Sequence, residues 1–233
     1  WALAKAFLKD KTLVPELVQG SFRGSAAVLG TAFVLNMYGD TGMVPLMIIG
    51  AVPLYNIYSV IVLTIESPRR EEIEGSPVKN TIKGIATNPI IIGIVVGLLL
   101  SIFRVDFPLM IDNTIGNIAK MATPLALLAI GGSFEFSNAL KKMGPAVTGS
   151  AIKLVIMAAV FLPVAVWLGY RDAKLMALVI MLGSPTTPSC YIMAKNMKND
   201  GVLTASIVVT TTLLASFTLT GWIYLLKCTG LIG

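Results

Sequence analysis

The sequence is poor in charge and in the residues that most often build catalytic or metal sites. Of its 233 residues, 13% are charged, two are cysteine and none is histidine. A soluble globular domain has about one quarter charged residues. The lack of histidine argues against a zinc or haem site, and Cys190 and Cys228 offer no disulfide framework. We therefore expect no metal, no cofactor and no enzyme activity.

Apolar residues dominate what is present. Hydrophobic residues make up 55% of the chain, and the mean hydropathy is +0.82. Apolar runs of about 18 to 25 residues match helices that cross a hydrocarbon core, whereas a β-barrel would show short alternating segments. The sequence predicts an all-α integral membrane protein with seven transmembrane helices. Their predicted ranges are 13–38, 43–65, 85–103, 115–134, 146–168, 173–194 and 202–226.

The distribution of basic residues indicates a membrane orientation. The net charge of +6 would suit nucleic acid, but the lysines and arginines lie mostly in short loops between the predicted spans. If the 66–84 loop is cytoplasmic, most of them lie on the cytoplasmic side, as the positive-inside rule requires. We expect a multi-pass protein of the cytoplasmic (cell) membrane. Its expected partners are the lipid bilayer and a small organic anion, without nucleic acid, and a homodimer is the assembly we consider.

A polar stretch, ESPRREEIEGSPVKN at 66–80, divides the chain unequally. We expect residues 1–65 to hold the last two spans of a first repeat, residues 66–84 to form a cytoplasmic linker, and residues 85–233 to form a second, five-helix repeat. Three further helices are then expected before Trp1, which makes ten in all.

An internal comparison supports a repeat. Aligning RGSAAVLGTAFVLNMYGDTG (23–42) with GSPTTPSCYIMAKNMKNDGV (183–202) matches an asparagine, a methionine and an aspartate after a break rich in small and polar residues. An odd number of spans separates the copies, so they are inverted. Inverted repeats with interrupted helices indicate a secondary transporter. A chance match of a few identities is the alternative.

Several segments, in order, resemble the auxin efflux carrier family, especially its bacterial, malate/malonate permease-like members. They are QGSFRGSAAVLGTAF (19–33), TNPIIIGIVVGLLL (87–100), MATPLALLAIGGSF (121–134), AIKLVIMAAVFLP (151–163) and SPTTPSCYIMAKNMKNDGVLTASIVV (184–209). The resemblance implies a ten-helix, inverted five-plus-five transporter, with two broken helices crossing at mid-membrane. It also implies organic anion substrates such as auxin, malate or malonate, and an elevator-like motion.

The chain departs from this family at both crossover positions. Plant members have an Asn-Pro element at the first crossover, where this chain has Gly24 and Ser25. At the second, the family's first proline corresponds to Pro185, but a second proline of plant members falls at Cys190. These departures argue against auxin as the substrate.

The second break is predicted over residues 183–191, GSPTTPSCY. Pro185 and Pro188 lack N–H donors, so the carbonyls of residues 181–184 lose their helical partners. A new half-helix starting near Ser189 would present free N–H groups, which suit a carboxylate. Pro185, Thr186, Thr187, Pro188 and Ser189 are therefore candidate binding residues. The alternative is a structural kink whose hydroxyls bond back to the backbone.

Arg23, Gly24 and Ser25 form the corresponding first break. Arg23 lies roughly 15 Å into its span, where a cation usually faces a cavity or a partner. No acidic residue is predicted deep in any span, and Glu135, at a cytoplasmic end, is the nearest candidate. The expected partner of Arg23 is therefore an anionic substrate or the carbonyls freed by the breaks, and proton antiport through a buried carboxylate is disfavoured.

Lys153 completes the candidate site. It is predicted either to point at the broken helices and stabilise their free carbonyls, much as a bound cation would, or to snorkel to the cytoplasmic face. Lys120 is predicted to snorkel at an interface, and Asn88-Pro89 to start a helix. The sequence thus predicts a transporter that moves a small organic anion by alternating access. The alternatives are a sodium-coupled organic-anion symporter, a seven-helix receptor and an ion channel.

Overall fold

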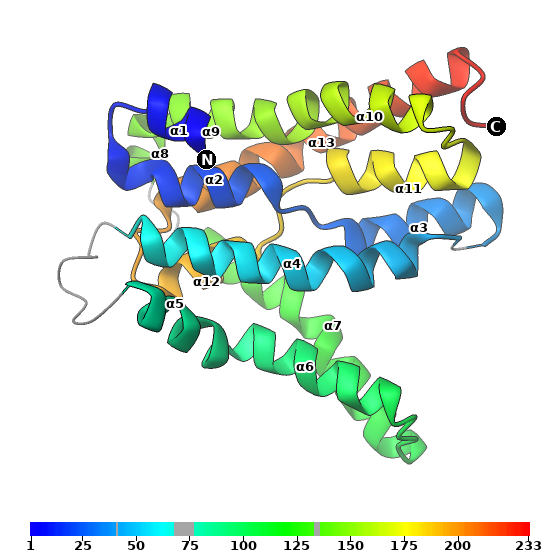
Figure 1. Cartoon of the computed structure of the whole chain (residues 1–233), viewed down its shortest axis with the longest axis horizontal. Coiled ribbons are helices and arrows are strands. Elements are labelled where there is room, and N and C mark those ends of the chain that lie inside the picture. The colour runs from blue at the N-terminus through cyan, green and yellow to red at the C-terminus, as the bar shows by residue number, and fades with distance from the viewer. Residues whose placement is uncertain (41, 68–76, 133–135) are drawn as a thin grey trace.

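The computed structural model describes residues 1–40, 42–67, 77–132 and 136–233, and over these ranges it contains helices and no strands (Figure 1). The first helices are α1 (Ala2–Phe7), the 3-10 turn η1 (Lys11–Leu13), α2 (Val14–Phe22), α3 (Ala26–Tyr38), α4 (Val44–Ile65), α5 (Pro77–Ala86) and α6 (Pro89–Ile102). They are followed by α7 (Leu109–Gly132), α8 (Phe136–Lys141), α9 (Met143–Ala151), the π-helical turn η3 (Ile152–Ile156), α10 (Met157–Trp167), α11 (Asp172–Gly183), α12 (Ser189–Asn196) and α13 (Val202–Cys228).

Four of the predicted spans are long, apolar helices. By length and composition, α4, α7, the continuous helix Met143–Trp167 and α13 suit a membrane crossing, within the part of the chain that the structure describes. Helix α6 is apolar but shorter. Two of the predicted spans are interrupted. The span 13–38 is divided into α2 and α3, and the span 173–194 is divided into α11 and α12. The chain therefore contains the two broken helices that were expected.

Two predicted boundaries were wrong. The linker 66–84 was expected to be a loop, but α5 begins at Pro77, and proline at the first position of a helix costs no hydrogen bond. Helix α7 begins at Leu109, six residues before the predicted start at 115, because polar residues such as Asp112 were assigned to the preceding loop. The predicted start at Asn88-Pro89 is confirmed, since Asn88 Oδ1 accepts from the Ile90 amide at 2.9 Å.

The two broken segments run in opposite directions through the middle of the molecule. In Figure 1, α2 and α3 run from left to right, and α11 and α12 run from right to left. Helix α3 lies beside α11, and α2 lies beside α12. The long helix α4 packs against both α2 and α3 of the first broken segment. The long helix α13 packs against both α11 and α12 of the second. This arrangement brings the two breaks together at the centre.

Small residues let α13 approach its neighbours closely. A Cβ atom at Gly20 of α2 would lie 2.8 Å from Ile207 Cδ1, and one at Gly149 of α9 would lie 2.9 Å from the same atom. The Ile207 side chain therefore fills a notch made by two glycines, the kind of small-residue contact on which membrane helices rely. Around it, Leu13, Leu17, Ala146 and Leu203 form a buried cluster. This cluster holds α2, α9 and α13 in one body.

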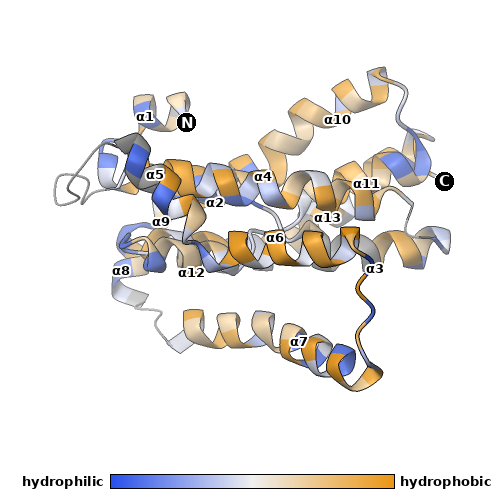
Figure 2. Ribbon diagram, turned by 60° about the horizontal axis from the view of Figure 1, so that its bottom comes forward, coloured by the Kyte–Doolittle hydropathy of each residue, from blue (hydrophilic) through white to orange (hydrophobic). Residues whose placement is uncertain are grey.

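Helices α6 and α7 lie at the edge of this body. Both angle away from the other helices, and α6 shows a mostly hydrophobic surface (Figures 1 and 2). No residue of α6 is buried, and α7 buries only Ala126 and Ile130. Apolar side chains on such faces suit contact with lipid tails, which are as apolar as leucine.

Candidate binding site

The breaks are tied together by hydrogen bonds. The Ser25 amide donates to the Pro185 carbonyl at 2.9 Å. The Thr186 hydroxyl donates to the Gly20 carbonyl at 2.7 Å, and the Thr186 amide donates to Thr211 Oγ1 of α13 at 3.0 Å. Non-helical backbone within a membrane must be satisfied by protein or by water. These bonds meet that requirement and join the two broken segments into one unit.

The second break has the local structure that its prolines dictate. Helix α11 ends at Gly183, Ser184 is extended, and α12 begins at Ser189, where the new half-helix was expected. The Thr186 hydroxyl bonds to the other broken segment and not to its own helix, unlike the simple kink considered above. The Thr187 and Ser189 hydroxyls lie 3.2 Å apart and share one hydrogen bond. The break therefore places hydroxyl groups at the start of α12.

Lys153 donates hydrogen bonds to the carbonyls that the second break leaves without helical partners. Its side chain is 1% exposed, and its ammonium donates to the carbonyls of Leu182 and Met181 at 2.9 and 3.2 Å. This geometry matches the first of the two predicted orientations. The second, snorkelling to the cytoplasmic face, was wrong, because the freed carbonyls are better partners than a distant interface.

A π-helical turn carries Lys153. Residues Ile152–Ile156 adopt i→i+5 pairing, and the Trp222 indole of α13 donates to the Leu154 carbonyl at 3.0 Å. Single π-turns inside α-helices occur frequently at functional sites. Neither the π-helical turn nor the role of Trp222 was predicted from the sequence, because neither changes the apolar pattern of the span. Together they hold the lysine in position beside the crossing.

Gly24 makes the close approach possible. A Cβ atom at this position would lie 2.6 Å from Ser184 Oγ and 2.9 Å from Lys153 Nζ. Contacts this short do not occur at a real Cβ, so any side chain would displace the cluster. The glycine predicted at the first break is therefore required by the packing around Lys153 and Ser184.

Arg23 contacts different groups at the crossing from those that Lys153 contacts. Its side chain is 4% exposed, and Nη2 donates to Ser189 Oγ at 2.9 Å. Nη1 lies 3.5 Å from Ser59 Oγ and 3.4 Å from Met193 Sδ, and Nε is buried without a partner. The expectation that Arg23 bonds to freed carbonyls was wrong, because Lys153 has taken them. Its partners are neutral side chains.

Two polar residues of α4 were not predicted as part of this site. Ser59 contacts Arg23, and Asn56, one helical turn earlier, is 1% exposed with an unpartnered Oδ1. Its amide nitrogen donates to the Val52 carbonyl. The signal was available, since polar residues three apart in an otherwise apolar span lie on one face. They add hydroxyl and amide groups to the side of the crossing that holds Arg23.

A buried carboxylate was also missed. Glu16 lies within the predicted span 13–38 and is 1% exposed, which corrects the expectation that no such acid is present. Its Oε1 accepts from the Gly201 amide at 2.8 Å, and its Oε2 accepts from the Thr204 amide and hydroxyl at 2.9 and 3.1 Å. An anion is stabilised at a helix N-terminus, here that of α13. Glu135, taken as the nearest acid, lies outside the described residues.

Ion pairs between side chains do not balance the two cations of the crossing. Over the described ranges, the ion pairs are Lys5–Glu66 and Lys142–Asp200, both at exposed or half-exposed positions. Arg23 and Lys153 take part in neither. A buried cation without an acidic contact is costly, and the carbonyls around Lys153 and the Ser189 hydroxyl beside Arg23 are the groups that stabilise the two charges.

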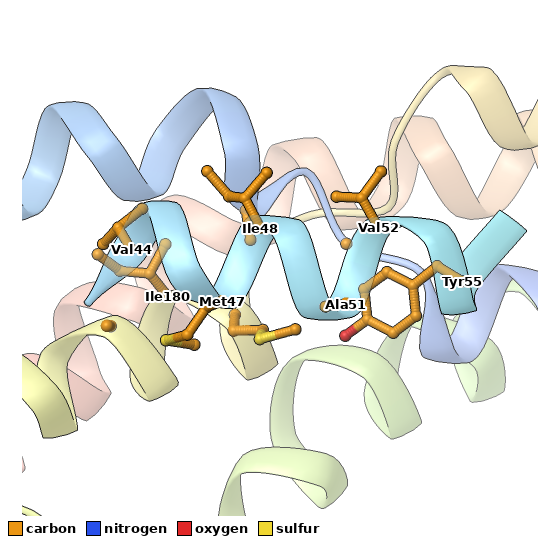
Figure 3. Close-up of a pocket in the computed structure, with 11 residues that line it drawn as sticks. Val44, Met47, Ile48, Ala51, Val52, Tyr55 and Ile180 are labelled. Carbon is orange, nitrogen blue, oxygen red and sulfur yellow. The ribbon is translucent and has the colours of Figure 1, made fainter. Parts of the chain in front are cut away.

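The space beside the crossing is small. A pocket next to Gly24 is lined by residues between Val44 and Tyr55 along α4 and by Ala177, Ile180 and Met181 of α11, with Val44 nearest to Ile180 in the view (Figure 3). It offers about 20 Å³ to a water-sized sphere, enough for a water molecule but not for an organic acid. Entry of a ligand from this side therefore requires the helices to move.

Comparison with known proteins gives one result. A family model described as a membrane transport protein matches residues 17–223, which is most of the chain and includes both breaks. No curated protein and no solved structure matches. The matched model is that of the family which the quoted segments resemble, so this prediction is confirmed.

Proposed function

We propose that this chain, which belongs to the membrane transport protein family, moves a small organic anion across the membrane by alternating access. Members of the family are transporters and not enzymes, and the apolar helices suit a multi-pass membrane protein. The proposed membrane is the cytoplasmic one, on the evidence of the basic loops. The proposed substrate class is a carboxylate such as malate or malonate.

The observation that carries this proposal is the pair of buried cations at the crossing. Arg23 belongs to the first break and Lys153 to a separate helix, and the two contact different groups of the second break. Neither has an acidic contact among the described residues. A carboxylate placed between the breaks would gain charge-assisted hydrogen bonds, which are about twice as strong as neutral ones.

The groups around the cations suit carboxylate oxygens. Ser25, Thr187 and Ser189 carry hydroxyls at or beside the breaks. The free amides expected at the start of α12 are only partly available, because those of Cys190 and Tyr191 donate to the Thr187 and Pro188 carbonyls. Gly24, Pro185, Thr186 and Pro188 shape the backbone that presents them. In this proposal the nine residues predicted from the sequence form one site. They are Arg23, Gly24, Ser25, Lys153, Pro185, Thr186, Thr187, Pro188 and Ser189.

The proposed motion follows from how the site is closed. The pocket beside Gly24 is too small for an organic acid, so access alternates only if the crossing moves relative to other helices. The hydrogen bonds between the breaks make the crossing a unit that moves as one body. We propose that this unit, together with α9 and α13, which are packed against α2, slides against the other helices in an elevator-like motion.

The alternatives fit these contacts less well. A sodium ion at the second break would need the carbonyls of Met181 and Leu182, which the Lys153 ammonium already occupies. Sodium coupling at this position is therefore disfavoured. A channel would need a continuous polar stripe across the membrane, whereas the buried positions of α11 are apolar up to Gly183.

Ligand-induced thermal stabilisation of the purified protein tests the proposal. Malate and malonate are expected to raise the melting temperature in a saturable manner, with and without sodium, because a ligand that binds only the folded state stabilises it. The Arg23→Ala variant should lose the effect, and the Lys120→Ala variant, in which an exposed lysine of α7 is removed, should keep it. If no carboxylate stabilises the protein, or if Arg23→Ala responds like the wild type, the proposed site is wrong.

A further inference from the structure

We infer that Glu16 sets the charge preference of the crossing, so that the site binds an anion with one negative charge more tightly than an anion with two. This inference rests on the proposed function and adds a property that the crossing residues alone do not define. Three observations support the role of Glu16: the number of buried charges, the position of Glu16 along α2, and the buried amide of Gln19 between Glu16 and the crossing.

The buried charges do not cancel. Among the described residues, the charged side chains classed as buried are Glu16, Arg23 and Lys153, which together carry a net charge of +1. A ligand with one negative charge neutralises this group. A ligand with two leaves an excess negative charge in an interior of low dielectric constant, which is unfavourable.

By helical spacing, Glu16 lies on the face of α2 that leads to Arg23, the extended residue just after the end of the helix. The two residues are seven apart, about two helical turns, so they are separated by roughly 10 Å along the helix axis. Both side chains are buried between α2 and its neighbours, away from bulk solvent. Salt in solution therefore screens their field only weakly. A carboxylate bound at Arg23 would experience the negative charge of Glu16.

Gln19 lies between them on this face. Its side chain is 0% exposed, and neither its amide oxygen nor its amide nitrogen has a hydrogen-bond partner. Buried amides are nearly always paired, and internal water is the usual partner where protein groups are lacking. Glu16, Gln19 and Arg23 therefore form a buried polar column that runs from the N-terminus of α13 to the crossing.

The size of the effect follows from Coulomb's law. Across roughly 10 Å, at an effective dielectric constant of about 20, one charge changes the affinity for another by up to about tenfold. The positive end of the α13 dipole offsets part of the Glu16 charge. We expect removal of the Glu16 charge to shift the preference between a dianion and a monoanion by about threefold to tenfold toward the dianion.

Malonate and its monomethyl ester test the inference, because they share a skeleton but carry two charges and one. Dissociation constants are measured for both with the purified protein in nanodiscs, at a pH where malonate is doubly ionised. The wild type should bind the ester more tightly. Glu16→Gln should shift the ratio of the two constants toward malonate by about threefold to tenfold.

Two further variants separate charge from structure. Thr204→Val removes a hydroxyl that donates to Glu16 but leaves the carboxylate, so it should lower the melting temperature and leave the ratio unchanged. Gln19→Glu adds a second negative charge to the same face and should shift the ratio further toward the ester. If Glu16→Gln does not fold, Gln19→Glu decides the question.

The outcomes distinguish this inference from the proposed function. A wild type that prefers malonate, or a ratio that neither Glu16→Gln nor Gln19→Glu changes, overturns the role of Glu16 while leaving an anion site in place. If neither ligand binds to the wild type, the proposed function fails and the inference fails with it.

Discussion

The two half-helices that lead into the crossing occupy equivalent places but have opposite chemistry. Counted from their last residues, Phe22 of α2 and Gly183 of α11, several buried positions of one correspond to buried positions of the other. Glu16, Gln19 and Arg23 of the first correspond to Ala177, Ile180 and Ser184 of the second. All six are buried. One half-helix thus brings charge to the crossing, while the other is apolar up to its break.

This difference shows that the crossing obtains its two cations in two ways. On the side of α2, the charge comes from the broken segment itself, through Arg23. On the side of α11, it comes from outside the broken segments, through Lys153 on the π-helical turn. The small pocket of Figure 3 lies against the apolar half-helix, next to Ala177 and Ile180. This asymmetry can be tested at Lys153, at Gly24 and at the pair Ile180 and Gln19.

The largest effect is expected for Lys153→Met. The substitution keeps the length of the side chain but leaves the carbonyls of Met181 and Leu182 without partners. Since a buried unsatisfied group costs about 1–3 kcal/mol, we expect a loss of about 3 kcal/mol in the free energy of unfolding. Thermal unfolding in detergent measures it. Lys120→Met, at an exposed position, should change little, and equal melting temperatures for the two variants would contradict the assigned role of Lys153.

Gly24→Ala should have the next largest effect. The added methyl group meets Ser184 Oγ and Lys153 Nζ, and overpacking of this kind costs about 1–3 kcal/mol. Both thermal stability and anion binding should fall. Gly97→Ala on α6 is the control, because a Cβ there has open space around it. A Gly24→Ala protein as stable as this control would show that the two breaks do not approach each other so closely.

Substitutions that exchange a polar and an apolar residue between the two half-helices should change the stability by different amounts. Ile180→Gln places an amide on the apolar half-helix and should cost about 2 kcal/mol, since it also removes a packed side chain. Gln19→Leu should change stability by less than about 1 kcal/mol, because its amide has no protein partner to lose. Denaturation of both variants measures the difference. Equal losses would mean that the two halves are not chemically distinct.

The smallest effect is expected at Asp10, outside the membrane-spanning segments. Hydrogen bonds from the side chain and backbone of Thr12 lower the pKa of this carboxyl, so its contribution is present above its unfolded pKa and is lost as the pH falls through the folded value. The group is exposed, and Asp10→Ala should cost less than about 1 kcal/mol at neutral pH. The difference from the wild type should vanish in acid. A difference that persists in acid would contradict the role of the ionised carboxyl.

The broken helices could be predicted because their causes are local. Proline at 185 and 188 removes backbone donors wherever these residues are placed, and α12 begins at Ser189 as expected. The partners of the two cations could not be predicted in this way. Lys153 reaches the freed carbonyls only because a π-helical turn and Trp222 direct it there. Arg23 was then left to hydroxyls of α4 and α12.

The burial of Glu16 could not be predicted from the sequence either. In the sequence it is an acid close to the start of an apolar run, a position at which a carboxylate usually reaches water. Only the packing of α2 against α13 places it on the Gly201 and Thr204 amides, almost 190 residues away in sequence. Its burial, and its position in line with Arg23, are properties of the assembled helices.

By itself, the sequence determined the helical membrane architecture, the family and the positions of the breaks. Hydrophobic length, proline chemistry and residue order act along the chain and do not depend on what packs nearby. The tertiary structure decided which cation serves which break, and it placed a buried carboxylate behind one of them. The physical reason is that a buried charge is stabilised by groups from several helices, and the direction in which each helix faces is set by packing.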